Sequence, residues 1–171
     1  MHDPTIFENL KVAFENRIYD LDTIKREIRI THRSDQMDFA VLARKFAIQF
    51  TLFDQEEVSA EIILGASLRD LADEILETPG GNPGTSLTVR FQKHVQEAAT
   101  QCPQIEEVLS DIWENEVLVI QTLSFMYGDD EFGYLNNIEV KFRTQINEEN
   151  MQEIPDFLHS VLDALRVLHA I

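Results

Sequence analysis

The sequence contains very little cysteine, since Cys102 is the single one among 171 residues. An intramolecular disulfide is therefore excluded, and the cysteine usage gives no sign of an oxidising compartment. Long apolar runs are also missing, because none reaches the roughly 18 residues of a membrane-spanning helix. The first ten residues carry acids where a secretory signal carries bases, and they lack a continuous apolar core. These absences predict a cytoplasmic protein that does not insert into a membrane.

Basic residues are scarce as well. The chain has 14 Lys and Arg against 31 Asp and Glu, which gives a formal net charge of −17. Such a surface argues against nucleic acid or an anionic membrane as the main partner. It is compatible with solubility, with a basic protein partner or with a salt-rich cytoplasm. Hydrophobic residues make up 44% of the chain, too many for a disordered protein, so we expect a single domain over residues 1–171.

The clearest structural signal lies in residues 117–145, which predict a β-hairpin. In its second strand Ile138, Val140 and Phe142 alternate with charged residues, as expected for a strand with one wet face. Its first strand begins with four apolar residues in a row, residues 117–120, so both of its faces should be covered. That pattern predicts a central position in the sheet.

The turn of this hairpin is acidic. The four residues 127–130 (Tyr-Gly-Asp-Asp) resemble the metal-binding motif of viral RNA-dependent RNA polymerases, in which adjacent aspartates help to hold two Mg²⁺ ions. The resemblance covers only these four residues; the chain is too short for such an enzyme, and its charge would repel a nucleic-acid backbone. A solvated turn is the simpler interpretation. A weak divalent-ion site formed by Asp129, Asp130 and Glu131 stays open, and no other cofactor is indicated.

The other segments alternate between helical and extended periodicity. Apolar spacing predicts helices over about residues 4–16 and 68–77 and a closing helix after Pro155; alternation predicts strands around residues 24–31, 39–53 and 58–64. Ser67 and Asp70 resemble a capping box at the start of the second helix. Residues 17–22 and 36–45 fit either helix or strand. A parity shift between Ala43 and Phe46 indicates a β-bulge near residues 44–45 or a helix that passes into a strand.

A loop rich in glycine and proline, Thr78–Ser86, is the expected mobile segment. It lacks the lysine and the spacing of a phosphate-binding P-loop. After it, Leu87, Phe91 and Val95 recur every four residues, which predicts the first of two inserted helices over residues 86–115.

Candidate catalytic and metal-binding residues are few. His32 with Asp35 and Asp38 comes closest to a metal-ligand cluster, although it falls in an expected turn. Cys102 lies on an apolar helical face with no histidine and acid arranged to activate it, so we expect a small buried residue and not a nucleophile. No catalytic motif passes a spacing test, which favours a function other than catalysis.

The element order predicts an α+β fold. We expect one antiparallel sheet of about five strands, with helices mainly on one face and the C-terminal helix closing the core. Over the whole chain this order and the acidity resemble class I type III secretion chaperones, small acidic dimers that bind an unfolded client segment. The inserted helical pair departs from that pattern, and no residue motif supports the resemblance.

Three functions follow as hypotheses. The first is a non-enzymatic protein-binding, adaptor or chaperone-like module, whose partner is another protein or a second copy in a homodimer. The second is a small-molecule-binding domain, or an enzyme with an unrecognised site. The third is a structural subunit of an oligomeric assembly, motivated by the wide apolar stripe of the last helix.

Overall fold

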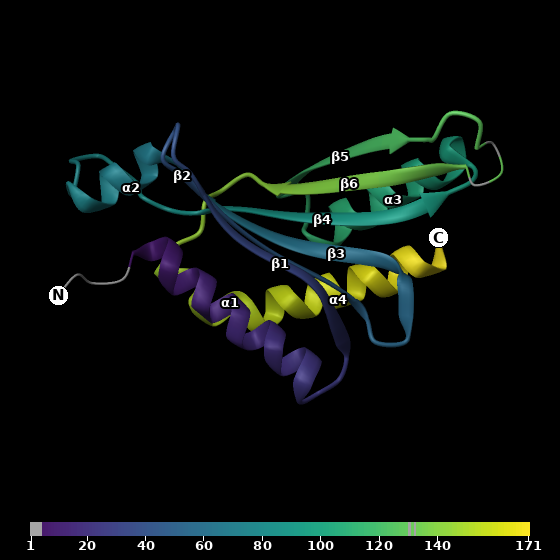
Figure 1. The fold of residues 1–171 in the computed structure, drawn as a ribbon, viewed down its shortest axis with the longest axis horizontal. Helices are drawn as coiled ribbons and strands as arrows, with labels where there is room; N and C mark the ends of the chain where they lie inside the picture. Colours follow the sequence, from purple (N-terminus) through teal and green to yellow (C-terminus); the bar gives the residue numbers. More distant parts are fainter. Residues whose placement is uncertain (1–4, 130, 132) are drawn as a thin grey trace.

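The computed structural model describes residues 5–129, 131 and 133–171. Within this part of the chain, one antiparallel sheet of six strands combines with four α-helices and a short 3-10 helix (Figure 1). The predicted α+β class is confirmed, with six strands where about five were expected. The elements follow the chain as α1 (Ile6–Thr23), β1 (Ile28–Asp38), β2 (Ala43–Leu52), β3 (Gln55–Ala66), α2 (Leu68–Ile75), β4 (Ser86–Val95), α3 (Ala98–Ile112), β5 (Val117–Ser124), β6 (Tyr134–Phe142), η1 (Glu148–Glu153) and α4 (Ile154–Ala170).

The strand order is β1-β2-β3-β4-β6-β5, and every neighbouring pair is antiparallel. Helices α1 and α4 cover the β1–β3 part of one sheet face, and α3 covers the β4–β5 part of the same face. Side chains from the covered face of the strands meet those of α1, α3 and α4 in one contiguous apolar core. The opposite face of the sheet carries no helix among the described residues.

Helix α1 begins at Thr5, whose hydroxyl accepts a hydrogen bond from the backbone N–H of Glu8. Its buried residues Phe7, Leu10, Phe14 and Ile18 continue the three-to-four-residue spacing without a break. The helix therefore includes residues 17–22, which the sequence left undecided, and ends at Thr23 instead of residue 16.

The β1–β2 hairpin explains the shift in parity near Ala43. Residues 39–42 form the turn. The apolar residues before position 43 therefore belong to the turn, and those from Phe46 onward belong to β2. No bulge lies at residues 44–45. The register irregularity lies instead between Ile30 and His32 in β1. Residues 36–45 are thus the end of one strand, a turn and the start of the next.

The prediction of a helical pair over residues 86–115 is wrong in its first half. Residues 86–95 form strand β4, in which alternate side chains from Leu87 to Val95 are buried. A spacing of four residues suits both a helix and every second inward position of a strand; Val89 and Lys93, also buried, decide for the strand. Only α3 remains of the predicted pair, with Pro103 inside it.

The predicted hairpin of β5 and β6 is present, but the central position expected for its first strand is wrong. Strand β5 lies at the edge of the sheet and pairs only with β6 among the described strands. Its outward-facing Leu118 and Ile120 are 48% and 36% exposed.

The C-terminal helix closes the core, as predicted. Pro155 lies in its first turn, and Leu158, Val161, Leu162, Leu165 and Leu168 are at most 3% exposed. Its wide apolar stripe is therefore covered within the chain. This removes the observation that motivated a structural subunit of a larger assembly.

Candidate functional site

Helix α2 is the most unusual element of the fold, because most of its large apolar side chains are exposed. Leu68, Ile75 and Leu76, at its two ends, are 50%, 71% and 73% exposed, and no residue of the helix is buried. The predicted capping box of Ser67 and Asp70 is present and fixes the start of the helix. An amphipathic surface helix normally turns its apolar stripe toward the core, so this stripe is available to something else.

Polar contacts hold α2 in this orientation. The carboxylate of Glu74 accepts a hydrogen bond of 2.8 Å from the backbone N–H of Ile6, at the start of α1. On the same side of the helix, Asp70 accepts one of 3.2 Å from the side-chain amide of Gln145. Leu71 alone of the stripe packs partly against the core. The acidic side of α2 is thus anchored, and the remaining apolar residues point outward.

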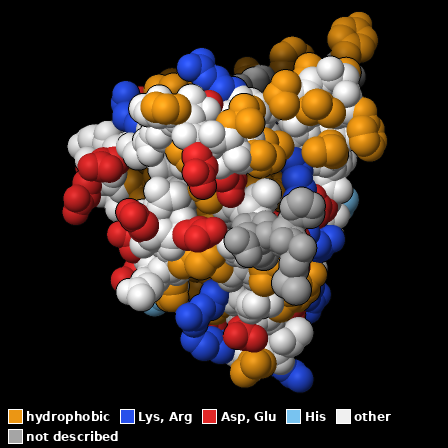
Figure 2. Space-filling view, turned by 90° about the vertical axis from the view of Figure 1, so that its left-hand side faces the viewer, with side chains coloured by type: hydrophobic (Ala, Val, Ile, Leu, Met, Phe, Trp, Pro, Cys, Tyr) orange, Lys and Arg blue, Asp and Glu red, His pale blue; other side chains and the backbone are white. Residues whose placement is uncertain are grey.

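The β1–β2 turn adds further apolar surface at the same end of the molecule. Phe39, Val41 and Leu42 are 82%, 58% and 43% exposed. Because Arg44 in β2 pairs with Ala66, the last residue before the N-cap of α2, this turn and the helix leave the sheet side by side. Figure 2 shows this end of the molecule, with hydrophobic side chains gathered in its upper part and acidic ones beside them. We call Phe39, Val41, Leu42, Leu68, Ile75 and Leu76 the α2-end surface.

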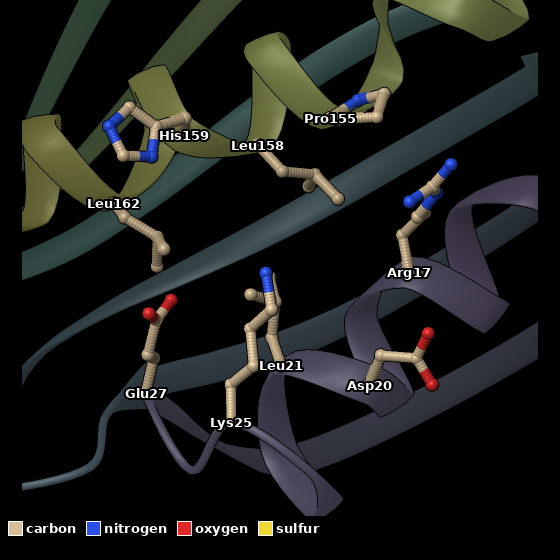
Figure 3. A pocket seen from close by; sticks show the side chains of 9 residues that line it. All are labelled: Arg17, Asp20, Leu21, Lys25, Glu27, Pro155, Leu158, His159 and Leu162. Carbon is tan, nitrogen blue, oxygen red and sulfur yellow. The ribbon is translucent and has the colours of Figure 1, made fainter.

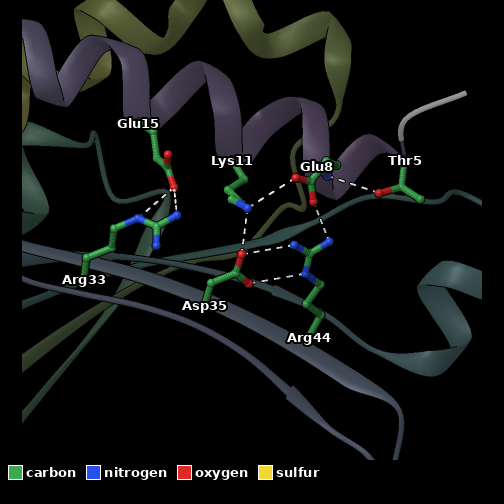
Figure 4. Close-up of polar contacts among 7 residues, drawn as sticks. All are labelled: Thr5, Glu8, Lys11, Glu15, Arg33, Asp35 and Arg44. Carbon is green, nitrogen blue, oxygen red and sulfur yellow. Dashed lines mark hydrogen bonds and ion pairs between the residues drawn. The ribbon is translucent and has the colours of Figure 1, made fainter.

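A network of ion pairs joins α1 to β1 and β2 near this end of the molecule (Figure 4). Asp35 of β1 accepts hydrogen bonds from Lys11 of α1 (2.7 Å) and from Arg44 of β2 (3.1 Å). Glu8 of α1 pairs with the same two cations, and the Arg44 guanidinium lies over the ring of Phe7 at 4.7 Å. A neighbouring pair, Arg33 and Glu15, also joins β1 to α1.

These pairs shift the titration of both carboxylates. Partial burial would by itself raise the pKa of Asp35 and of Glu8, but hydrogen bonds and charges from Lys11 and Arg44 outweigh it and lower both pKa values. The basic stretch of residues 25–33 is partly explained in the same way. Arg29 and Arg33 of this stretch pair with acids, Glu56 and Glu15.

A second uncovered apolar surface lies on β5 and the segment that follows it. Beside Leu118 and Ile120, the exposed fractions are 37% for Leu123 and 67%, 75% and 102% for Phe125, Met126 and Tyr127. We call these six residues the β5 surface. In contrast to the α2-end surface, it combines exposed apolar side chains with the unpaired backbone edge of a strand.

A cavity with an aromatic lining is of a size that could hold a small molecule. It has a volume of about 340 Å³ and lies between β6, α1 and the start of α4, with Phe14, Phe142 and Phe157 among its lining residues. Trp113 contacts two of these rings, at 5.6 Å from Phe142 and 6.3 Å from Phe157, and so packs against the core. Ligand pockets typically measure about 300–1,000 Å³, so this cavity is at the lower limit.

A second hollow lies between α1 and α4 (Figure 3). Arg17 and Lys25 extend toward α4, from which His159 projects, over a floor that includes Leu158 and Leu162. Its volume of about 260 Å³ is below the usual range, and cationic and acidic groups share its rim. Nothing in this arrangement selects one chemistry.

The residues singled out in the sequence as chemical candidates are not brought together. His32 and Asp35 lie in a strand and not in a turn, three residues apart and so on opposite faces, and Asp35 is occupied by Lys11 and Arg44. Burial raises the pKa of the Cys102 thiol, and its sulfur lies 3.8 Å from the side-chain amide nitrogen of Asn136. The described residues contain no group of three or more His, Cys, Asp or Glu placed to hold a metal.

The acidic turn of the β5–β6 hairpin is described in part. Asp129 and Glu131 are described, whereas Asp130 lies outside the described residues. A divalent-ion site there remains a prediction. The mobility of the Thr78–Ser86 loop also remains a prediction. Near the end of this loop, Thr85 and Ile146 are joined by two backbone hydrogen bonds.

Sequence reasoning missed both apolar surfaces. The stripe of α2 was visible in the sequence as an amphipathic pattern typical of a core or an interface, but the pattern does not say which way the helix turns. The edge position of β5 has no local signal at all. Both depend on how distant segments pack.

No protein-family model matches the chain, and no curated protein or solved structure matches it significantly. Of the helices in the described part of the chain, none is long and apolar enough to cross a membrane.

Proposed function

We propose that this protein is a non-enzymatic protein-binding module, and that the α2-end surface receives the partner. The observation that carries the proposal is the orientation of α2, whose acidic side is anchored to the protein while Ile75 and Leu76 are 71% and 73% exposed. Exposed apolar residues that cluster within a polar rim are typical of interaction sites. A cytoplasmic location agrees with the single free cysteine.

The partner we infer carries an apolar segment flanked by Lys or Arg. Asp73 of α2 and Glu77, just after the helix, are close in sequence to these apolar residues, and the chain as a whole has a formal charge of −17. A basic flank would gain from this field, which raises the association rate and loses strength as salt increases. Nucleic acid and anionic membrane would be repelled.

The test is capture of the tagged full chain from its native lysate, followed by rebinding of the purified partner. The double variant Ile75→Glu, Leu76→Glu should weaken binding about 30- to 1,000-fold, since two interface anchors each contribute roughly 1–2 kcal/mol. The matched control is the double variant Val12→Glu, Ile24→Glu, whose parent residues are 46% and 73% exposed and belong to neither apolar surface. Both variants should melt at the wild-type temperature.

A partner that binds the α2 variant as well as it binds the wild type would contradict this assignment. So would the absence of any partner that rebinds after purification. Affinity that does not change between low and high salt would remove the electrostatic part of the proposal and leave the apolar part.

A second candidate function is the binding of a small apolar molecule in the cavity lined by Phe14, Phe142 and Phe157. A bound aromatic or aliphatic compound would contact the rings that touch Trp113, so its binding should change the fluorescence of this single tryptophan. A thermal-shift screen should then give hits that Phe157→Trp, which fills the space, abolishes. A screen without hits would exclude this candidate.

A further inference from the structure

Strand β5 has the sequence of a central strand but the position of an edge strand. Four apolar residues in a row at its start fit a strand that is covered on both sides. In the structure one side packs against α3, while Leu118 and Ile120 on the other side remain 48% and 36% exposed. If another strand paired with the free edge of β5, this strand would have the central position that its sequence predicts.

The edge of β5 is also undefended. Its eight residues, VLVIQTLS, include neither a charged residue nor a proline. Natural edge strands are commonly protected by charges, prolines, bulges or short length, because their free N–H and C=O groups pair readily with another strand. The regular register of β5 against β6 shows no bulge either. This edge is thus suited to strand addition.

We propose that a second copy of this chain adds to the sheet through β5. The two β5 strands run antiparallel around a two-fold axis and join the two six-stranded sheets into one. The site is separate from the α2-end surface, so this proposal does not depend on the proposed function.

The neutrality of β5 makes this strand the place where two copies of so acidic a chain can meet. Two copies that each carry a formal charge of −17 repel one another across most of their surfaces. Strand β5 offers a charge-free contact line on both copies, so that no ionised group of the strand has to be desolvated. Each copy also supplies the N–H and C=O groups that the other copy leaves unpaired.

The side chains of β5 are self-complementary in such a pair. In antiparallel strands, directly opposite residues lie on the same face, so a two-fold axis through Ile120 places this residue beside its own counterpart. Leu118 then faces Thr122, and Val119 faces Gln121. Every opposite pair is neutral, and the exposed isoleucines form the centre of the contact.

The segment after β5 enlarges this contact. In this register, residues 125–127 of one copy lie beside residues 113–115 of the other, which directly precede β5. The six residues of the β5 surface are 36–102% exposed, which corresponds to on the order of 700 Å² of surface, close to the roughly 800 Å² that each partner buries in a standard interface. The exposed edge and the exposed turn residues would be covered together.

The experiment uses sedimentation equilibrium of the full chain at micromolar concentrations. We expect a wild-type dimer, and Ile120→Lys and Ile120→Glu should each raise the dimer dissociation constant about 100-fold or more, since like charges then face one another at the axis. An equimolar mixture of the two variants should restore the dimer, because lysine and glutamate now meet. Gln36→Lys on β1, the opposite edge of the sheet, is the matched control and should leave the dimer intact.

Circular dichroism and the melting temperature establish that each variant is folded. If Ile120→Lys does not fold, Leu118→Lys, at the more exposed position, replaces it. A cysteine at position 120 in a Cys102→Ser background should form an intermolecular disulfide on oxidation, since opposite Cα atoms about 4.5–5.5 Å apart suit that bond. A Thr31→Cys control on β1 should not. A monomeric wild type, or a dimer that charges at positions 118 and 120 do not affect, would overturn the proposal.

Discussion

The two edges of the sheet, β1 and β5, are protected to very different degrees. Strand β1 carries several charged residues, its register is interrupted between Ile30 and His32, and ion pairs of Arg33 and Asp35 join it to α1. Strand β5 carries no charge, runs in regular register and presents exposed leucine and isoleucine. Edge strands without protection are prone to pair with other strands. Charges and contacts with α1 thus protect one edge of the sheet, whereas the other edge has no such protection among the described residues.

The largest expected effect on stability comes from a substitution in α1, the helix that covers the β1 side of the sheet. Phe14 of α1 is 1% exposed and meets Phe157 of α4 edge to face at a centroid distance of 6.0 Å. Phe14→Ala should lower the free energy of unfolding by about 3–5 kcal/mol, because it removes a buried ring and leaves a cavity. Leu118→Ala on β5 should cost the monomer less than about 1 kcal/mol. Urea denaturation at a concentration where the chain is monomeric measures both, and equal losses would contradict the comparison.

A smaller effect should follow from opening the ion-pair network. Arg44→Ala leaves the carboxylates of Glu8 and Asp35 close together with Lys11 as their remaining cation, and it uncovers Phe7. We expect a loss of about 1–2 kcal/mol, more than an isolated surface ion pair contributes. Arg29→Ala is the matched control. Like Arg44, Arg29 lies over an aromatic ring, that of Phe53, but it pairs with a single acid and its side chain is 53% exposed. If the two variants lost equal stability, the network would have no special role.

On the β5 side, a substitution should increase stability. Lys93 of β4 is only 7% exposed on the covered face, lies opposite Asn136 of β6, and forms no ion pair with a described residue. Burial lowers the pKa of Lys93. Lys93→Met should therefore raise the free energy of unfolding by about 1 kcal/mol at neutral pH. Lys141→Met, on the exposed face of β6, should have no effect, and a destabilised Lys93→Met variant would show that the ammonium group is satisfied after all.

The weakest expected effect is a dependence on acid. The pKa values of Glu8 and Asp35 are lowered in the folded protein, so both carboxylates contribute stability above their ordinary pKa of about 4, and this is lost as the pH falls below that value. A double variant Glu8→Gln, Asp35→Asn should flatten the pH dependence of the melting temperature between about pH 2 and 5. A curve parallel to that of the wild type would show that these carboxylates do not contribute.

The sequence by itself determined the elements whose patterns are unambiguous. The hairpin of β5 and β6, the capping box of α2, the closing helix α4 and the α+β order follow from alternation, spacing and capping residues, which act over a few neighbours. Positions with two possible periods were not determined. In β4, a spacing of four residues fits both a helix and a strand; Val89, between Leu87 and Phe91, and the pairing with β3 and β6 select the strand.

The tertiary structure decided which surfaces stay open. The apolar stripe of α2 is evident in the sequence, but its outward direction results from hydrogen bonds between Glu74 and Ile6, 68 residues apart, and between Asp70 and Gln145, 75 residues apart. The edge position of β5 results from the order in which six strands pair. A local pattern says how much of a side chain should be covered, whereas long-range packing decides whether the chain itself provides the cover.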